Sequence, residues 1–210
     1  MDNEKALKLI FQSAELYSQN FCNQMLLIIS ANKSLNKTFS VEIQFDKTNF
    51  LHLTGVKFLP GTSISPGVFF DKCIAKRVSV NDFEMSADGT TEQKLAILPQ
   101  ILSSVNLSAN MIGDFQGRRP ALITDKLVGN VRGCLGIVYD SKRDNFAPNT
   151  VLNLDMRQEV QNQQRIIAIY KKGKSESHYE TLVYKAKKSV GKELAFLILI
   201  LTYQYPRTNP

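Results

Sequence analysis

The second half of the chain is a succession of short segments in which apolar and polar residues tend to alternate. Six such segments follow residue 107, and glycine, proline, asparagine or charged residues separate them. Alternation with a period of two is typical of strands that bury one face. The predicted strands cover residues 111–115, 121–126, 133–139, 150–156, 164–171 and 179–186. Because the connections between them are short, the pattern indicates mostly antiparallel pairing.

The first half of the chain has a mainly helical pattern. Apolar residues recur at helical spacing over residues 4–31, which predicts one long helix or two short ones, and residues 68–77 and 90–105 have a similar pattern. Residues 38–45 alternate and predict a strand. Helices followed by a run of strands favour an α+β fold, with N-terminal helices packed on a small, mostly antiparallel twisted sheet.

Charge is divided unevenly along the chain. Residues 1–116 carry 10 Lys and Arg against 11 Asp and Glu, whereas residues 117–210 carry 16 against 8. The whole positive excess of +7 therefore lies in the half that reads as strands. Such a surface suits an anionic partner, of which nucleic acid is the commonest, and the alternative is a solvated lysine-rich surface that binds nothing in particular.

Composition excludes several classes of protein. The 43% hydrophobic and 21% charged residues are typical of a folded domain, and the three cysteines are too far apart to form a zinc motif. The N-terminus lacks the basic region of a signal peptide, and the longest apolar run has eight residues, whereas a membrane span needs about 20. The sequence also lacks nucleotide-cofactor and zinc-protease motifs. We therefore expect a cytoplasmic protein with no membrane segment, no cofactor and no metal.

His52 is the first candidate for catalysis. It is one of two histidines and lies at the end of a predicted strand, just before Gly55. Histidine titrates near neutral pH and suits general acid–base chemistry. The alternative is a structural histidine that hydrogen-bonds the backbone.

Basic residues that border the predicted strands are candidates for holding phosphate. Arg118, Arg119 and Lys126 are the first group, and a solvated strand edge is the alternative. Arg157 shares a strand face with Asp155, so the two side chains form either one wall of a cleft or a simple ion pair.

A second basic group lies at the end of a predicted hairpin. Tyr170, followed by Lys171 and Lys172, can stack on a base while the lysines hold its phosphate. The alternative is an ordinary lysine-rich turn.

Four segments of the chain resemble a known family when they are taken together, in their order and spacing. They are Phe50-Leu-His-Leu-Thr-Gly-Val56, Thr90-Thr-Glu-Gln-Lys94, Thr124-Asp-Lys-Leu-Val-Gly129 and Pro148-Asn-Thr-Val-Leu-Asn-Leu-Asp-Met-Arg157. The family is the phage-associated branch of the barnase–EndoU–colicin–RelE-like nucleases, its fourth group. The resemblance covers roughly residues 35–190, while each segment alone is a weak signal.

The resemblance implies helices packed on an antiparallel sheet whose concave face takes RNA, and a nuclease that needs no metal. The matching polar positions are His52, Thr54, Lys126 and Arg157, with Thr91 as a further candidate. The paired glutamate and histidine of barnase-type sites have no match here. The resemblance also implies a division into a helical extension (residues 1–36), a nuclease domain (residues 37–190) and an apolar segment with a tail (residues 191–210).

Three functional hypotheses follow. The first is an endoribonuclease that cleaves through the 2′-hydroxyl, in which His52 is the acid or base, Thr54 orients, and Lys126 and Arg157 stabilise the phosphate. The basic residues Arg118, Arg119, Tyr170, Lys171 and Lys172 would bind the nucleic acid. The second is an inactive nucleic-acid- or protein-binding module of a mobile element. The third is a toxin-like domain with a specific RNA target, which would have an inhibitor or antitoxin protein as a partner.

Overall fold

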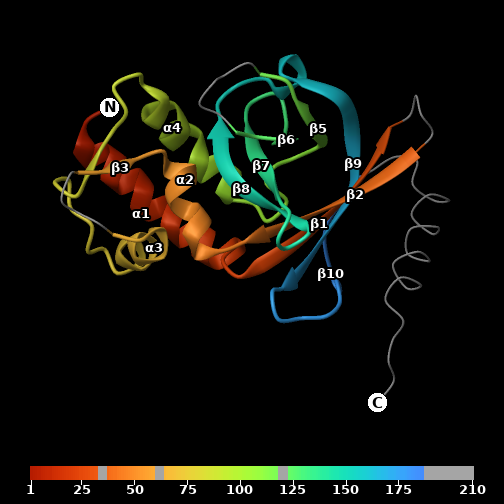
Figure 1. The fold of residues 1–210 in the computed structure, drawn as a ribbon, viewed down its shortest axis with the longest axis horizontal. Helices are drawn as coiled ribbons and strands as arrows, with labels where there is room; N and C mark the ends of the chain where they lie inside the picture. Colours follow the sequence, from red (N-terminus) through yellow and green to blue (C-terminus); the bar gives the residue numbers. More distant parts are fainter. Residues whose placement is uncertain (33–36, 60–63, 118–122, 187–210) are drawn as a thin grey trace.

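The chain folds into an α+β structure, which confirms the expected class (Figure 1). A computed structural model describes residues 1–32, 37–59, 64–117 and 123–186. The elements in the first half are α1 (Asn3–Asn20), β1 (Gln24–Asn32), β2 (Lys37–Phe45), the 3-10 turn η1 (Lys47–Asn49), α2 (Phe50–Thr54), β3 (Lys57–Phe58), α3 (Pro66–Ile74), β4 (Phe83–Glu84) and α4 (Thr90–Leu102). Those in the second half are β5 (Met111–Phe115), β6 (Lys126–Gly129), β7 (Cys134–Asp140), β8 (Asn145–Leu152), the 3-10 turn η2 (Met156–Gln158), β9 (Val160–Gly173) and β10 (Thr181–Lys185).

Eight strands form the main sheet, so it is larger than the small sheet that the sequence predicted. Their order is β1-β2-β8-β7-β6-β5-β9-β10, and β1 also pairs with β9, so the circuit of paired strands closes. All pairs in it are antiparallel except β2 with β8. β3 and β4 form a separate two-stranded sheet. In the described part of the chain, no helix is both long and apolar enough to cross a membrane.

The helices cover one face of this sheet and share a core with it (Figure 1). Asp2 caps α1 by accepting a hydrogen bond from the Lys5 amide at 2.7 Å, and the apolar stripe of α1 from Ala6 to Tyr17 is buried. On β1, Leu26 and Ile28 face the helices, whereas Leu27 and Ile29 pack with Ala168 on the opposite face.

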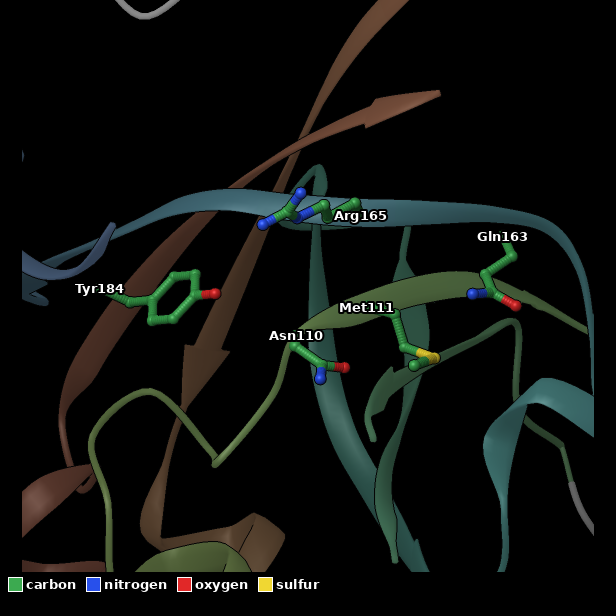
Figure 2. Close-up of a pocket in the computed structure, with 5 residues that line it drawn as sticks. All are labelled: Asn110, Met111, Gln163, Arg165 and Tyr184. Carbon is green, nitrogen blue, oxygen red and sulfur yellow. The ribbon is translucent and has the colours of Figure 1, made fainter. Parts of the chain in front are cut away.

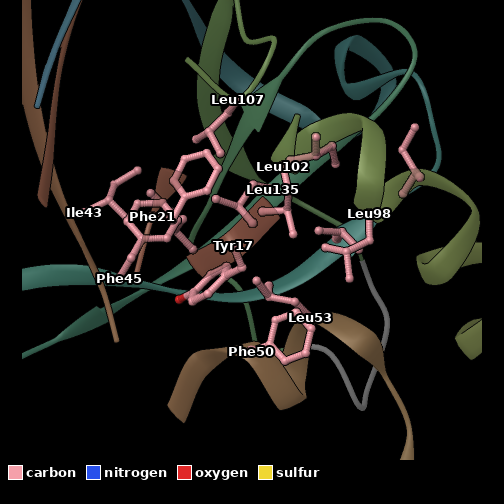
Figure 3. Close-up of a cluster of buried hydrophobic side chains, with 14 of the residues drawn as sticks. Tyr17, Phe21, Ile43, Phe45, Phe50, Leu53, Leu98, Leu102, Leu107 and Leu135 are labelled. Carbon is pink, nitrogen blue, oxygen red and sulfur yellow. The ribbon is translucent and has the colours of Figure 1, made fainter. Parts of the chain in front are cut away.

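An aromatic cluster forms the part of the core beneath α2 (Figure 3). The ring of Phe50 lies 5.5 Å from that of Tyr17 and 5.3 Å from that of Phe70, measured between centroids. The Tyr17 hydroxyl donates to the main-chain carbonyl of Asp46 at 2.8 Å, so the one polar group of this cluster is satisfied. These contacts hold α2 against α1 and α3.

Asp46 joins three parts of the chain next to this cluster. Its carboxylate accepts hydrogen bonds from Lys174 at 2.7 Å, Gln44 at 2.8 Å and Arg143 at 2.6 Å. Burial acts to raise the pKa of Asp46, but the three donors together outweigh burial and hold the pKa below its ordinary value. Asp46 thereby ties the end of β2 to the β7–β8 turn and to the β9–β10 connection.

Several sequence predictions need correction. Residues 4–31 are helical only as far as α1, because Gln24–Asn32 is β1, and this strand pairs with β2 and β9 inside the main sheet. β6 begins at Lys126, where the predicted strand ended, and β8 ends at Leu152, so the chain around Met156 is a 3-10 turn. Residues 189–201, for which the apolar run left helix or strand open, lie outside the described residues, and so does the expected apolar segment with its tail (residues 191–210).

Candidate functional site

A cleft of about 770 Å³ opens where the short helix α2 and the start of α4 meet β7 and β8. Its lining comes from four separate parts of the chain: Asn49, Leu51, His52 and Gly55 to Phe58; Ser86, Thr90 and Lys94; Ile123; and Val138 with Ala147 to Thr150. A concave site of this size suits a small ligand or part of a polymer.

Helix α2 is short, and both core packing and a glycine at its end determine its position. Phe50 and Leu53 anchor it in the core, and Gly55 ends it in the left-handed conformation at φ 71°. The Thr54 hydroxyl donates to the carbonyl of Leu51 at 2.7 Å. His52 lies on the opposite side of this helix from its buried residues, and its side chain is exposed at the cleft.

Gly55 also makes room for Lys94, which reaches the cleft from the second turn of α4. A Cβ at Gly55 would lie 2.6 Å from Cδ of Lys94, so the lysine stem passes directly over the glycine backbone. The Lys94 ammonium group donates to the main-chain carbonyl of His52 at 3.2 Å. Two of its three protons remain for other partners.

The partly buried position of Lys94 affects the pKa of its ammonium group. Burial lowers the pKa of the Lys94 ammonium group from its ordinary value, and the negative charge of Asp88 acts in the opposite direction. Asp88 itself accepts hydrogen bonds from the backbone and side chain of Thr90 at 3.0 and 2.7 Å. Lysines with a lowered pKa in a cleft are candidates for function.

Thr91 fixes α4 relative to α2. Its hydroxyl donates to the carbonyl of Gly55 at 2.8 Å and accepts a hydrogen bond from the amide of Ser86 at 3.0 Å. The side chain is fully buried, so it positions the cleft wall and does not face a ligand.

A β-bulge shapes the opposite wall of the cleft. Gly136 of β7 pairs with Thr150 of β8 and the next residue pairs with Pro148, so Asn149 has no partner across the ladder. Bulges re-aim side chains and are common beside functional sites. The Asn149 amide donates to the carbonyl of Ile123 and accepts from the Thr124 hydroxyl at 3.2 Å.

The cleft favours a negatively charged ligand. His52, Lys57 and Lys94 are among the described residues that line it, and no Asp or Glu is. Thr90 adds the N-terminus of α4, where the helix dipole is positive. In the described ranges no group of three or more His, Cys, Asp or Glu side chains could hold a metal ion.

Of the four residues predicted to act in catalysis, the structure brings His52 to the cleft. It lies on α2, so the predicted strand at this position is wrong. Thr54 is fully buried and its hydroxyl is used within α2.

Lys126 and Arg157 are not among the residues that line the cleft. Lys126 on β6 is ion-paired with Asp114, its direct partner across the ladder on β5. Arg157 on η2 donates through Nε to Asp155 at 3.0 Å. The ion-pair alternative for Asp155 and Arg157 is therefore present in the structure, on a 3-10 turn and not on a strand.

The residues predicted to bind nucleic acid lie apart from the cleft or outside the described chain. Tyr170, Lys171 and Lys172 are on β9, where the Lys172 ammonium group lies 4.5 Å from the centroid of the Tyr179 ring. Arg118 and Arg119 fall outside the described residues.

Lys57, Lys94 and Asn149 are polar cleft residues that sequence patterns do not single out. Lys94 and Asn149 stand within segments that carried the family resemblance, and Lys57 directly follows another. The signal that could have found them is the convergence of these segments. Three of the four segments line the cleft, and Thr124 of the remaining one hydrogen-bonds the cleft residue Asn149.

Comparison with known proteins identifies the family of the chain. A family model described as phage-Barnase-EndoU-ColicinE5/D-RelE like nuclease 4 matches residues 9–188. The matched range contains the whole cleft and confirms the resemblance of the four segments. Searches of the curated proteins and of the solved structures found no match.

Proposed function

Since the chain belongs to the family of phage barnase–EndoU–colicin E5/D–RelE-like nucleases, we propose that it is a metal-independent endoribonuclease acting at the cleft. The observation that carries this proposal is the lining of the cleft, in which His52 stands with Lys57 and Lys94 and with no carboxylate. Phosphodiester cleavage through the 2′-hydroxyl needs proton transfer at the 2′- and 5′-oxygens and positive charge at the phosphate, and this set supplies one acid–base group and two cations.

In the proposed reaction the ribose 2′-oxygen attacks the adjacent phosphorus. The bond from phosphorus to the 5′-oxygen breaks, and the products are a 2′,3′-cyclic phosphate and a free 5′-hydroxyl. His52 is either the base that takes the 2′-hydroxyl proton or the acid that gives a proton to the leaving 5′-oxygen, since its exposed ring can reach a bound strand, and solvent water makes the other transfer.

Lys94 stabilises the charge that develops on the phosphate oxygens. Its ammonium group is held in place by the carbonyl of His52, so it requires little reorganisation when charge develops. Lys57 adds a second positive charge at the cleft. We assign no step to Lys126 or Arg157, because each is in an ion pair outside the cleft.

The test is incubation with single-stranded RNA in the presence of a chelator, beside the same sequence with 2′-deoxyribose at every position. We expect cleavage of the RNA to cyclic-phosphate ends and an intact deoxy strand, because the deoxy strand lacks the attacking oxygen. RNA that stays intact would contradict the proposal. Salt-sensitive binding without cleavage would instead indicate the inactive binding module.

The lowered pKa of Lys94 predicts the alkaline side of the pH profile. Because the charged form is required, kcat/KM, which reports the pKa values of the free enzyme, should fall as pH rises through a pKa below the ordinary lysine value of about 10.5. Lys94→Gln should reduce kcat by about 10²-fold at neutral pH. Lys94→Arg, which keeps its charge, should lose the alkaline fall. An unchanged alkaline limb in Lys94→Arg would contradict this role.

The family also bears on partners. We infer that a toxin-like nuclease of this kind is held inactive by an inhibitor or antitoxin protein. The cleft would be the natural surface for such a partner to cover, since its lysines favour an acidic protein surface.

A further inference from the structure

A second hollow lies between β5 and β10, where β9 changes its pairing partner. In the strand order, β7 and β6 separate β5 from β8 of the cleft. β9 pairs with β5 through residues 160–165 and with β10 through residues 168–171. At the change-over, Ile166 donates to the carbonyl of Asn110, and Ala186 donates to the carbonyl of Ile167. β5 and β10 diverge from this point, and a hollow of about 370 Å³ remains between them.

Five of the described residues line this hollow, and none of them lines the cleft: Asn110, Met111, Gln163, Arg165 and Tyr184. Figure 2 shows the ring of Tyr184 on one side, Met111 and Gln163 on the other, and the side chains of Arg165 and Asn110 between them. The hollow therefore combines one aromatic ring, one thioether, two amides and one guanidinium group.

Arg165 is available to a ligand. Its side chain is exposed, and none of the described carboxylates forms an ion pair with it. Arg143 and Arg157, in contrast, are both paired with aspartates. An unpaired guanidinium group beside an aromatic ring suits a phosphate oxygen, which it can hold with two hydrogen bonds.

The other groups suit a base. Tyr184 is half-buried and packs against the core, so its ring is held in a fixed place while part of it stays accessible. The amides of Asn110 and Gln163 each carry donors and an acceptor, which match the edge of an unpaired base. Single-stranded RNA is recognised by this combination of stacking, edge contacts and a cation.

We propose that this hollow binds one unpaired nucleotide of the RNA, with its base on Tyr184 and its phosphate on Arg165. The inference rests on the proposed function, for which it supplies a subsite away from the scissile bond. Its volume is at the lower end of the roughly 300–1,000 Å³ typical of ligand sites, so it fits a single nucleotide and not a folded RNA.

The experiment measures binding separately from cleavage. A fluorescent 2′-O-methyl RNA hexanucleotide, which lacks the attacking hydroxyl, is titrated with the wild type, Arg165→Gln, Tyr184→Leu and Tyr184→Phe. We expect about a tenfold loss of affinity for Arg165→Gln and Tyr184→Leu, while Tyr184→Phe keeps the ring and binds nearly as well as the wild type. Lys185→Gln is the matched control. It removes an exposed positive charge next to Tyr184, and Lys185 does not line the hollow.

The outcomes separate the two proposals. A wild type that binds the hexanucleotide with this pattern but leaves RNA uncut would remove the nuclease proposal and leave the subsite standing. A wild type that cuts RNA while Arg165→Gln and Tyr184→Leu bind as tightly as Lys185→Gln would overturn the subsite. Absence of binding to the hexanucleotide by the wild type would overturn it as well. Each variant is first checked for an unchanged unfolding temperature.

Discussion

Replacing His52 with alanine should lower kcat for RNA cleavage by about 10²–10⁴-fold, because this is the contribution that a positioned acid or base usually makes. His52 is the only histidine among the described residues that line the cleft. The substitution should leave folding intact, since the His52 side chain is exposed and α2 is anchored by Phe50 and Leu53.

The chain offers a matched control in its other histidine. His178 is also exposed, but it lies between β9 and β10 and does not line the cleft. His178→Ala should cleave RNA at the wild-type rate, and both variants should unfold at the wild-type temperature. The measurement is the initial rate on a labelled oligonucleotide in chelator. Equal rates for His52→Ala and the wild type would remove His52 from the mechanism.

The convergence of the site could be predicted only in part from the sequence. The four segments that resemble the nuclease family can be recognised in the sequence. Three of them line the cleft, and the fourth contacts a cleft residue. Which side chain in each segment faces the ligand depends on local geometry. Asn149 lines the cleft because of a bulge, and Lys94 because Gly55 leaves room for its stem. Neither feature has a signature in a single sequence.

The two predicted phosphate ligands show why charge alone is a poor guide. Lys126 looks like a free cation in the sequence, whereas the sequence leaves a cleft wall and an ion pair with Asp155 open for Arg157. The ladder register of β5 and β6 places Asp114 directly across from Lys126, and the 3-10 turn brings the Asp155 carboxylate to Arg157. Strand register is set by the packing of the whole sheet, so Asp114 could not be identified as the partner of Lys126 from local patterns.

Periodicity predicts the fold class correctly, but it predicts the wrong type of secondary structure for β1 and α2. The sequence of β1 predicts a helix because the strand is buried on both faces, which removes the alternation that marks a strand. The sequence around α2 predicts a strand because apolar and polar residues alternate from Leu51 to Thr54. A helix of five residues is too short for a helical period to be visible. Core packing through Phe50 and the left-handed Gly55 determine its helical form.

Phe50→Ala should therefore destabilise the protein by about 3–5 kcal/mol, the usual cost of removing a buried aromatic ring. The ring is fully buried and contacts Tyr17 and Phe70 edge-on or tilted, so its loss leaves a cavity beneath α2. Domains of this kind have only about 5–15 kcal/mol of stability in total. Urea unfolding followed by circular dichroism measures the change as a shift in midpoint at constant slope.

Phe39→Ala is the control for this substitution, because Phe39 is an exposed ring on β2 with 36% of its surface accessible. Its loss should shift the free energy of unfolding by no more than about 0.5 kcal/mol. The two variants also separate stability from positioning. At a temperature where both stay folded, Phe50→Ala should still cleave RNA more slowly than Phe39→Ala, because α2 carries His52 and loses its anchor. If Phe50→Ala instead cleaves at the full rate while folded, the contacts of Thr91 and Lys94 alone must hold the cleft in its active geometry.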